Sequence, residues 1–400
     1  MSTGLLARAQ ALAGELTALR RSLHQEPELS YQERDTQLFL RQRLEAAGFT
    51  CRVVADTGLL AFPPATARGR AGPVVALRAE LDALPIHEAN EVSYRSRRDG
   101  VMHACGHDAH MTMVFGAGQL LASLAESLPG SFVLLFQPAE EVPPGGARRV
   151  LDEGVLAEAG VEAIFGLHVD TRYPSGSILL RKGPLMAASD RFRLTVIGKG
   201  GHAGYPHLAV DAVVIAAQIV LGLQAIVARR LDPMEPGVVS IGRIEGGTAD
   251  NILPERVTLS GTLRSHSSDV RRQLPEWIRE IATGIASGAG ARVEFEYLPG
   301  HPGLSNDPAV IDFLAEALAS DFDTGQIIEL TRPIMGGEDF AHYLEVMPGA
   351  FLRLGVRNEA GGIVHPIHSP RFNLDESALP VGAAALAIAA RAWLTRSAAG

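Results

Sequence analysis

The stretch from Met102 to Met111, MHACGHDAHM, constrains this chain of 400 residues more than any other part of its sequence. It places three histidines, a cysteine and an aspartate within eight residues, at the start of a predicted helix that continues as MVFGAGQLLASL. Imidazole and thiolate groups suit zinc, manganese or cobalt, and the start of a helix stabilises a thiolate. The stretch therefore favours a catalytic metal site over a histidine-rich surface loop with a buried structural cysteine.

Composition narrows the class of protein. A chain of this length exceeds what one hydrophobic core usually serves, so we expect two domains. Its residues are 46% hydrophobic and 20% charged, with a net charge of −9 and no long basic run, which disfavours binding to nucleic acid. The two cysteines, Cys51 and Cys105, do not suggest a disulfide framework, and this fits a reducing compartment.

Neither end of the sequence predicts export or membrane insertion. The N-terminal LLARAQALAGELTALRRSLHQ interleaves charge with helical spacing and lacks the apolar core and cleavage site of a signal peptide. The apolar stretch LPVGAAALAIAA stops at Arg391 and is too short to span a bilayer. We therefore expect a cytoplasmic protein with no membrane partner.

Acidic and imidazole side chains follow three predicted buried strands. They are Glu80 and Asp82 after Val74–Leu77, Glu140 and Glu141 after Phe132–Phe136, and His168 at the end of AIFGLHV. Sheets of α/β proteins place their chemistry at strand ends, and two adjacent buried carboxylates need a positive group nearby. Since Cys105 and His107 lie between the first two strands, these groups predict one assembled site.

Residues 188–300 predict a small α+β domain inserted into the first. In DRFRLTVIGK, Phe192, Leu194 and Val196 alternate with polar residues, as in a half-exposed antiparallel strand. The elements expected after it are a helix at 211–230, strands at 237–244 and 256–264, a helix at 268–287 and a strand at 291–298. The order is βαββαβ, a split βαβ unit, which leaves 1–187 and 301–400 as two parts of a catalytic domain.

The flanking parts predict alternating helices and strands, and hence an α/β fold. We expect helices at 4–24, 31–47, 307–322 and 376–394, strands at 50–54 and 350–356, and a surface loop at PPATARGRAGP. IMGGEDFAHYL predicts a glycine-rich turn that opens a further helix. The loop HPIHSPRFNLDE, bounded by prolines, supplies His365 and His368.

These side chains could surround two divalent ions. The candidate donors are Cys105, His107, Glu141, His168 and His368. Five donors with one of them shared leave open positions on each ion, which a catalytic site requires. Two ions acidify a water that they share, and Glu140, which is next to Glu141, is the natural base to take its proton. The pattern indicates metal-assisted hydrolysis of an amide or an ester.

Eight motifs carry a resemblance to a known family. In order they are LRAELDALP, MHACGHDAHM, FQPAEE, GLHV, GKGGHA, GGTADNILPE, MGGEDF and HSPRF. Together they resemble the M20 metallopeptidase family, in its amidohydrolase branch of hippurate hydrolases, N-acyl-L-amino acid amidohydrolases and auxin-conjugate hydrolases. The resemblance covers nearly the whole chain. It implies a mixed-sheet, zinc-peptidase-like catalytic domain with a smaller lid domain through which the protein forms a homodimer.

The resemblance also implies roles for the donors. Cys105 matches the ligand that bridges the two metals, and His107 and His168 would complete the first ion. Glu141 and His368 would complete the second ion. The general base of the family, which deprotonates the water and later protonates the leaving amine, corresponds to Glu140.

Five further positions match family residues in the lid and near the substrate. His202 matches a histidine donated to the neighbouring subunit's site, where its N–H stabilises the tetrahedral oxyanion. Asn251 and Arg264 match substrate contacts, and Arg264 would bind a free carboxylate through two hydrogen bonds. Gly336 and Gly337 lie where backbone N–H groups approach that carboxylate.

The remaining polar residues of the motifs receive smaller roles or none. Asp82 matches a carboxylate that orients a metal ligand or the base. Glu80 stands where the branch usually has an aspartate, and we leave it out of the site. His103, His110 and His365 match no ligand position.

The leading hypothesis is a binuclear amidohydrolase, using Mn, Zn or Co, that cleaves an N-acyl-L-amino acid into a carboxylate and an amino acid. Dipeptidase or carboxypeptidase activity at the same site is the alternative. A thiol hydrolase with Cys105 as nucleophile would leave Glu141, His168 and His368 without a task. A non-catalytic protein that binds a metal or an acyl amino acid is disfavoured, because no ligand and no base is missing.

Overall fold

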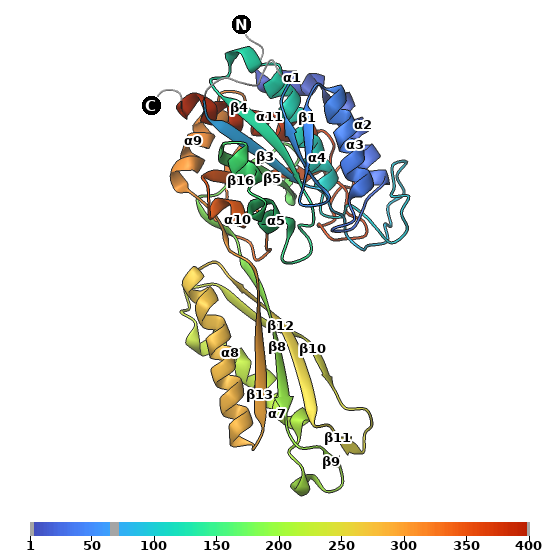
Figure 1. The fold of residues 1–400 in the computed structure, drawn as a ribbon, viewed down its shortest axis with the longest axis vertical. Coiled ribbons are helices and arrows are strands. Elements are labelled where there is room, and N and C mark those ends of the chain that lie inside the picture. Colours follow the sequence, from blue (N-terminus) through green and yellow to red (C-terminus); the bar gives the residue numbers. More distant parts are fainter. Residues whose placement is uncertain (1–3, 65–71, 398–400) are drawn as a thin grey trace. The chain divides into compact units, whose positions relative to one another are not determined.

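We describe a computed structural model of the chain over residues 4–64 and 72–397. Its contacts divide it into two compact units (Figure 1). The first comprises the chain up to Gly183, Ser305–Arg332 and the part from His342 onward, and the second comprises Pro184–Leu304 and Pro333–Ala341. The predicted insertion at 188–300 lies inside the second unit, which also takes in the glycine-rich turn of IMGGEDF. Residues 65–71 of the predicted surface loop lie outside the described residues.

An eight-stranded mixed sheet forms the centre of the first unit, in the order β1-β2-β4-β3-β5-β16-β6-β15. Its parallel middle consists of β4 (Ser131–Gln137), β3 (Val74–Glu80), β5 (Val161–Pro174) and β16 (Gly349–Arg357). The outer strands are β1 (Thr50–Val54), β2 (Gly58–Phe62), β6 (Ile178–Leu180) and β15 (Ile327–Glu329). The middle strands are buried along most of their length, as expected for parallel strands covered on both faces. The predicted α/β fold is confirmed.

Helices cover this sheet (Figure 1). Two of them, α4 (His107–Ala122) and α11 (Ala378–Ser397), pack against each other and against β3 and β5. The others are α1 (Leu5–Ala11), α2 (Ala13–Gln25), α3 (Arg34–Ala46), α5 (Gly146–Asp152), α6 (Val155–Glu158), α9 (Pro308–Leu318) and α10 (Ala341–Leu344), with a 3₁₀ turn, η2 (Ala125–Ser127). The helix predicted at 4–24 is divided, because the N–H of Leu12 bonds to the carbonyl of Ala9 in a tighter turn.

The second unit is an antiparallel sheet of order β10-β12-β8-β13 with two helices packed on it (Figure 1). Its main elements are β8 (Ala188–Ile197), α7 (Ala212–Ala225), β10 (Gly237–Gly246), β12 (Arg256–Ser265), α8 (Ser268–Gly288) and β13 (Arg292–His301), so the βαββαβ order is as predicted. A small ribbon joins β9 (Gly201–His202) to β11 (Ile252–Leu253). The short elements of this unit are η3 (Pro206–Leu208) and η4 (Ile226–Arg230). Two short strands, β7 (Gly183–Met186) and β14 (Leu304–Asn306), cross its boundaries with the first unit along the chain. Phe192, Leu194 and Val196 are buried and form part of the core.

Within residues 4–64 and 72–397, two helices are long and apolar enough to cross a membrane by length and composition alone, the α7–η4 helix and α11. The helix that carries LPVGAAALAIAA runs on to Ser397, so the expectation that this segment is too short to span a bilayer is wrong. In α11, however, 78% of the most apolar window is buried in the first unit, and in α7–η4 the figure is 33%. Neither helix is a convincing membrane span, since core helices pass the same test.

Candidate metal centre

The turn before α4 sets the geometry of the central motif. Gly106 has φ +93°, a left-handed conformation that L side chains rarely adopt, and an added Cβ would lie 2.6 Å from Cγ2 of Val169. Helix α4 then begins at His107. Only a glycine fits between Cys105 and His107. The turn at this glycine lets Cys105, which precedes it, and His107, which begins α4, direct their donor atoms to one site.

The described residues contain two groups of three donors that share the thiol of Cys105. One group adds His107 and His168, and the other adds Glu141 and His368, with the donor atoms of each group within 4.8 Å of one another. The Cys105 Sγ lies 3.2 Å from Nε2 of His168, and Nε2 of His368 lies 3.4 Å from Oε1 of Glu141. The structure therefore brings together the five predicted donors in the predicted two sets.

The residues fit a pair of cations. Nε2 of His107 and Oε1 of Glu141 are buried and have no hydrogen-bond partner among the described residues, a state that a bound metal would resolve. Burial and the nearby carboxylates of Glu141 and Glu140 raise the pKa of the Cys105 thiol well above its usual value. Such a pocket is negative and attracts positive charge, so the donor set suits two divalent metal ions.

Backbone carbonyls orient two of the histidines. Nδ1 of His168 lies 2.7 Å from the carbonyl oxygen of Val169, and Nδ1 of His107 lies 2.8 Å from that of Asp82. A carbonyl oxygen only accepts hydrogen bonds, so each Nδ1 carries a proton. In each ring this leaves Nε2 to serve as a ligand, provided that the ring is neutral.

The two rings differ in charge when no metal is bound. Burial lowers the pKa of His107, but the hydrogen bond to Asp82 and the charge of Glu80 outweigh burial and raise this pKa to about 10. Burial lowers the pKa of His168 well below its usual value, and the charges of His110 and Arg353 add to the effect. Binding of a metal at His107 therefore displaces a proton.

Asp82 connects three parts of the site. Its Oδ2 accepts hydrogen bonds from the hydroxyl of Ser30 at 2.7 Å and from the backbone N–H of Glu141 at 3.0 Å. Its Oδ1 lies 3.4 Å from Nδ1 of His107. One buried carboxylate thus contacts one donor residue directly and the backbone of another. Ser30 was not predicted, because QEPELS resembles an ordinary interruption between helices.

The predicted base lies beside the donors. A carboxylate oxygen of Glu140 lies within 4.8 Å of donor atoms of His107 and Glu141. Glu140 is only 8% exposed, so its carboxylate is largely shielded from bulk water. Adjacent residues on one turn therefore place two carboxylates at the same centre.

In the second unit, Arg264 and Gly337 lie together. An added Cβ on Gly337 would lie 2.8 Å from Cβ of Ser189 and 3.3 Å from Nη1 of Arg264, so a side chain here would crowd the guanidinium. Burial and the charge of Arg191 lower the pKa of Arg264, and within the described part of the chain Arg264 forms no ion pair. A half-buried guanidinium of this kind suits a carboxylate ligand. The neighbouring Gly336 accepts a backbone hydrogen bond through its carbonyl oxygen.

His202 and Asn251 lie on the β9–β11 ribbon, and both are exposed. Nδ1 of His202 accepts the backbone N–H of Gly204 at 2.9 Å, which leaves the proton of a neutral ring on Nε2. The ribbon adjoins one end of the strands β8 and β12 (Figure 1). At that end Ile197 pairs with Arg256, whereas Arg264 pairs with Ser189 at the other end of the ladder. Eight residues of strand separate these ends by roughly 27 Å. One second unit therefore does not bring His202 and Arg264 together.

A model of peptidase family M20/M25/M40 matches residues 76–392. The chain belongs to this family. The N-acetylcysteine deacetylase of Bacillus subtilis (strain 168) is 41% identical to it over 375 residues, which are 93% of this chain and 95% of that protein. Thermostable carboxypeptidase 2 of Saccharolobus solfataricus is 40% identical over 375 residues, 93% of each chain. The chain also resembles a solved structure, that of the Bacillus subtilis YXEP protein, which is described as a dinuclear metal binding peptidase from the M20 family. The two superpose with a TM-score of 0.83 at 38% sequence identity, and the match covers 96% of this chain and 99% of that one. The predicted family and fold are confirmed.

His110 is buried at the centre of this M20 fold without joining either donor set. Its Nδ1 lies 2.7 Å from Oε2 of Glu80, and its Nε2 accepts the backbone N–H of Val169 at 3.0 Å. Both ring nitrogens are therefore occupied. The glutamate at position 80 is completely buried and also pairs with Arg78. Glu80 and His110 thus tie α4 to β5 next to His168.

The other polar residues of the M20 motif also have neighbours outside the donor sets. Asp108 is buried against Arg20 at 2.8 Å and His24 at 2.7 Å. His103 is 1% exposed, burial lowers its pKa to about 3, and neither ring nitrogen has a partner among the described residues. His365 lines a separate polar pocket of about 370 Å³. Of the five candidate donors in the motif, only Cys105 and His107 join the donor sets.

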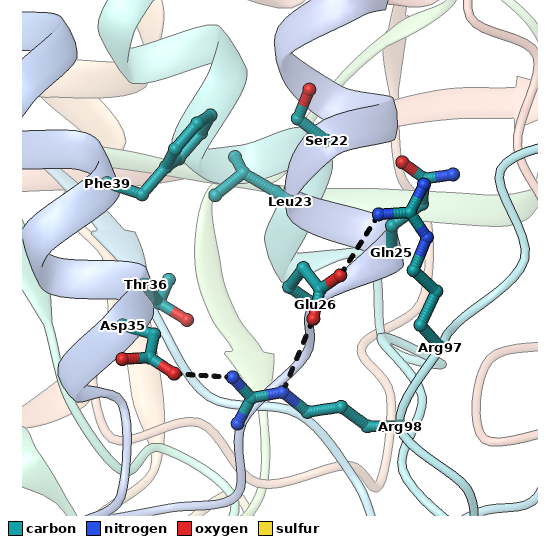
Figure 2. A pocket seen from close by; sticks show the side chains of 9 residues that line it. All are labelled: Ser22, Leu23, Gln25, Glu26, Asp35, Thr36, Phe39, Arg97 and Arg98. Atoms are coloured by element: carbon teal, nitrogen blue, oxygen red, sulfur yellow. Dashed lines mark hydrogen bonds and ion pairs between the residues drawn. The ribbon is translucent and has the colours of Figure 1, made fainter.

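A pocket of about 350 Å³ lies where α2 and α3 meet the loop at Arg97 and Arg98 (Figure 2). Arg98 pairs with Asp35 at 2.6 Å, and Arg97 pairs with Glu26 at 3.3 Å. The arginines of this pocket are thus neutralised by its own carboxylates. None of the predicted site residues lines it, so it lies apart from the M20 centre.

Proposed function

We propose that this chain is a binuclear metal-dependent amidohydrolase that cleaves N-acyl-L-amino acids into a carboxylate and a free amino acid. The observation that carries the proposal is the pair of donor sets sharing Cys105, with Glu140 beside them. The relative named as an N-acetylcysteine deacetylase supports this substrate class. The relative named as a carboxypeptidase supports the second candidate, cleavage of peptides at the same site.

The first unit would hold both ions and the base. One ion would be held by Cys105, His107 and His168, and the other by Cys105, Glu141 and His368. When bound, the two ions would supply Lewis acidity to the attacking water and to the scissile carbonyl. Glu140 would take the proton of the attacking water and later deliver it to the nitrogen of the leaving amine. Asp82 orients His107 and holds the backbone of Glu141 throughout the reaction.

The second unit would recognise the substrate as a lid. Arg264 binds the free carboxylate of the amino acid through two hydrogen bonds, and Gly336 and Gly337 let backbone N–H groups approach the same carboxylate. The half-buried guanidinium without an ion-pair partner supports this role. Asn251 adds a contact to the substrate from the exposed ribbon.

His202 would act on the site of a partner subunit in a homodimer. Its Nε2–H donates to the oxyanion that forms when the water attacks the carbonyl. The separation of His202 from Arg264 along the β8–β12 ladder supports action in trans. Helix α7 offers a surface for dimerisation, because Val213, Val214 and Leu221 are 45%, 52% and 74% exposed. We place the enzyme in the cytoplasm, with small acyl amino acids as its partners.

The experiment that tests the function is a substrate panel with defined metals. The protein is stripped with a chelator, reloaded with Mn, Zn or Co, and assayed on acetyl, benzoyl and indoleacetyl amino acids and on dipeptides. Amine release is read by mass spectrometry. Chelation should abolish release, and at least one metal should restore it on acyl amino acids. Release from dipeptides alone would favour the peptidase candidate.

Two further measurements separate the other hypotheses. If iodoacetamide inactivated a metal-free enzyme that was fully active beforehand, Cys105 would be a nucleophile. If calorimetry showed tight binding of acyl amino acids with no product on the whole panel, the protein would be a binding protein.

A further inference from the structure

Glu33 is a buried carboxylate attached to the turn that carries Glu140. It is 0% exposed and lies just before α3. Its Oε2 accepts the hydroxyl of Thr57 at 2.6 Å, and its Oε1 accepts the backbone N–H of Ala139 at 2.8 Å. A residue from the N-terminal part of the chain thus holds the residue that precedes the proposed base.

Ala139 adopts a conformation that requires support. Its φ is +51°, in the left-handed region, and it is completely buried. This conformation brings the Cβ of an alanine close to the neighbouring carbonyl oxygen and is therefore disfavoured. Its N–H is held by Glu33, and its carbonyl oxygen accepts the N–H of Gly146 at 2.9 Å. Both polar groups of Ala139 are therefore fixed.

The turn is held on both sides of Glu140. Before it, the N–H of Ala139 bonds to Glu33, and after it, the N–H of Glu141 bonds to Asp82 at 3.0 Å. Two buried carboxylates from different segments therefore fix the direction in which the side chain of Glu140 leaves the backbone. Asp82 was predicted to orient the site, whereas Glu33 was not.

We propose that Glu33 is a positioning residue for the general base: it keeps Ala139 in the left-handed conformation and so aims Glu140 at the attacking water. The inference rests on the proposed role of Glu140. A general base works when its oxygen lies within about 2.6–3.2 Å of the atom whose proton it takes, and a misplacement of about 1 Å can lower the rate roughly 100-fold. Glu33 belongs to neither donor set, and it acts through the backbone of Ala139.

The main test compares two substitutions of Glu33 in the metal-loaded enzyme. Glu33→Ala removes the acceptor of Ala139, so kcat should fall about 10- to 100-fold while KM and the content of two metals stay within about twofold. Glu33→Gln keeps an oxygen for the N–H of Ala139 and offers an N–H to Thr57, so kcat should stay within about threefold. Metal content is read by mass spectrometry after dialysis.

Glu28 supplies a matched control. Its buried Oε2 also accepts one backbone N–H and one hydroxyl, both from Thr36, at 2.8 and 2.9 Å. Its side chain is not bonded to the turn of Glu140. Glu28→Ala should leave kcat within about twofold of the unaltered enzyme. An equal fall in both alanine variants would mean that kcat reports loss of a buried carboxylate in general, and it would overturn the inference.

A second change tests the conformation itself. Glycine adopts positive φ without steric cost, so Ala139→Gly added to Glu33→Ala should restore kcat at least about threefold. If Glu33→Ala does not fold, the Glu33→Asp variant serves as the test. The side chain of aspartate is one methylene too short to keep both hydrogen bonds, so kcat should fall as expected for Glu33→Ala while KM and metal content stay unchanged.

The results separate this inference from the proposed function. Unchanged kcat in Glu33→Ala, or in Glu33→Asp when the alanine variant does not fold, overturns it. Loss of metal together with kcat also overturns it, because Glu33 would then support the donors rather than the base. If Glu140→Gln retained full activity, the proposed function would fail whatever Glu33 does.

Discussion

The two units of this chain carry their functional side chains in opposite ways. The first unit gathers donors from separate segments into one centre, with His107 and His168 buried. The second unit presents His202 and Asn251 on an exposed ribbon and Arg264 at the other end of the β8–β12 ladder. The first unit thus contains all five candidate donors, whereas one second unit does not bring His202 and Arg264 together.

The largest expected effect concerns the base in the first unit. Glu140→Gln keeps the shape of the side chain but cannot accept the proton, so kcat should fall about 10²- to 10⁴-fold. Both metals should remain bound, because Glu140 is in neither set that shares Cys105. Steady-state kinetics and metal analysis of the same sample check this. Full activity would remove Glu140 from the mechanism.

A mixing experiment addresses the second unit. His202→Ala should lower kcat about 10²- to 10³-fold, because an oxyanion donor is lost. This variant is then dissociated and reassembled with an equal amount of the Glu140→Gln variant, so that half of the resulting dimers contain one subunit of each kind. In each mixed dimer, one of the two sites has an intact Glu140 and receives an intact His202 from the other subunit. About a quarter of the full activity should return. If no activity returned, His202 would act within its own subunit, and one chain would supply every catalytic residue of its own site.

Loss of the shared thiol should separate metal binding from folding. Cys105→Ala removes a donor from both sets, so affinity for metal should fall at least about 100-fold and fewer than two ions should survive dialysis. Cys51, the other free cysteine, is half-buried and belongs to neither set. Cys51→Ala should keep both ions. If this variant also lost its metal, the metal loss in Cys105→Ala would not be evidence that Cys105 is a ligand.

Substrate recognition should depend on the charge of Arg264. Arg264→Ala should raise KM about 10- to 100-fold for acyl amino acids, through loss of a charge-assisted hydrogen bond to the carboxylate. Amides of the same substrates lack that carboxylate and should be affected little. Equal effects on both kinds of substrate would show that Arg264 supports the fold of the second unit and not the ligand.

The smallest effect concerns stability and pH. Burial raises the pKa of Glu33 above its usual 4.5. Between pH 4.5 and the raised pKa the folded chain holds a proton that the unfolded chain has released, so stability falls as pH rises through this window. Glu33→Gln has no such proton, and its stability relative to the unaltered protein should increase with pH. Urea unfolding in chelator from pH 4 to 8 measures the difference, and an advantage that shrinks as pH rises would contradict the sign.

Much of the metal centre could be predicted because its residues are chemically distinctive. Histidine, cysteine and paired glutamates near the ends of apolar strands predicted the five donors, and the resemblance to the M20 family implied their division into two sets. The same chemistry suggested too many ligands within the motif MHACGHDAHM. His110 and Asp108 instead form hydrogen bonds to Glu80, Arg20 and the backbone. The resemblance to the M20 family already gave His110 no ligand position, and the structure adds the hydrogen bonds that occupy its ring.

Other features left no signal in the sequence. Glu33 acts on Ala139, 106 residues later, and nothing in YQERD distinguishes it from a surface glutamate. The segment Pro333–Ala341 joins the second unit although it is flanked on both sides by the first, because it packs against residues such as Ala187 and His266. Long-range contacts of this kind depend on packing and not on local periodicity.

The order of strands in the sheet also has a consequence for synthesis. Strand β16 lies between β5 and β6, yet it leaves the ribosome after both of them and after the whole second unit. Until then one edge of β5 has no neighbour, and His368 has not yet been made. A nascent or truncated chain that stops before Gly349 therefore carries four of the five donors next to an open apolar strand edge, a state prone to aggregation. The part of the polypeptide from Gly349 onward closes the sheet and completes the centre.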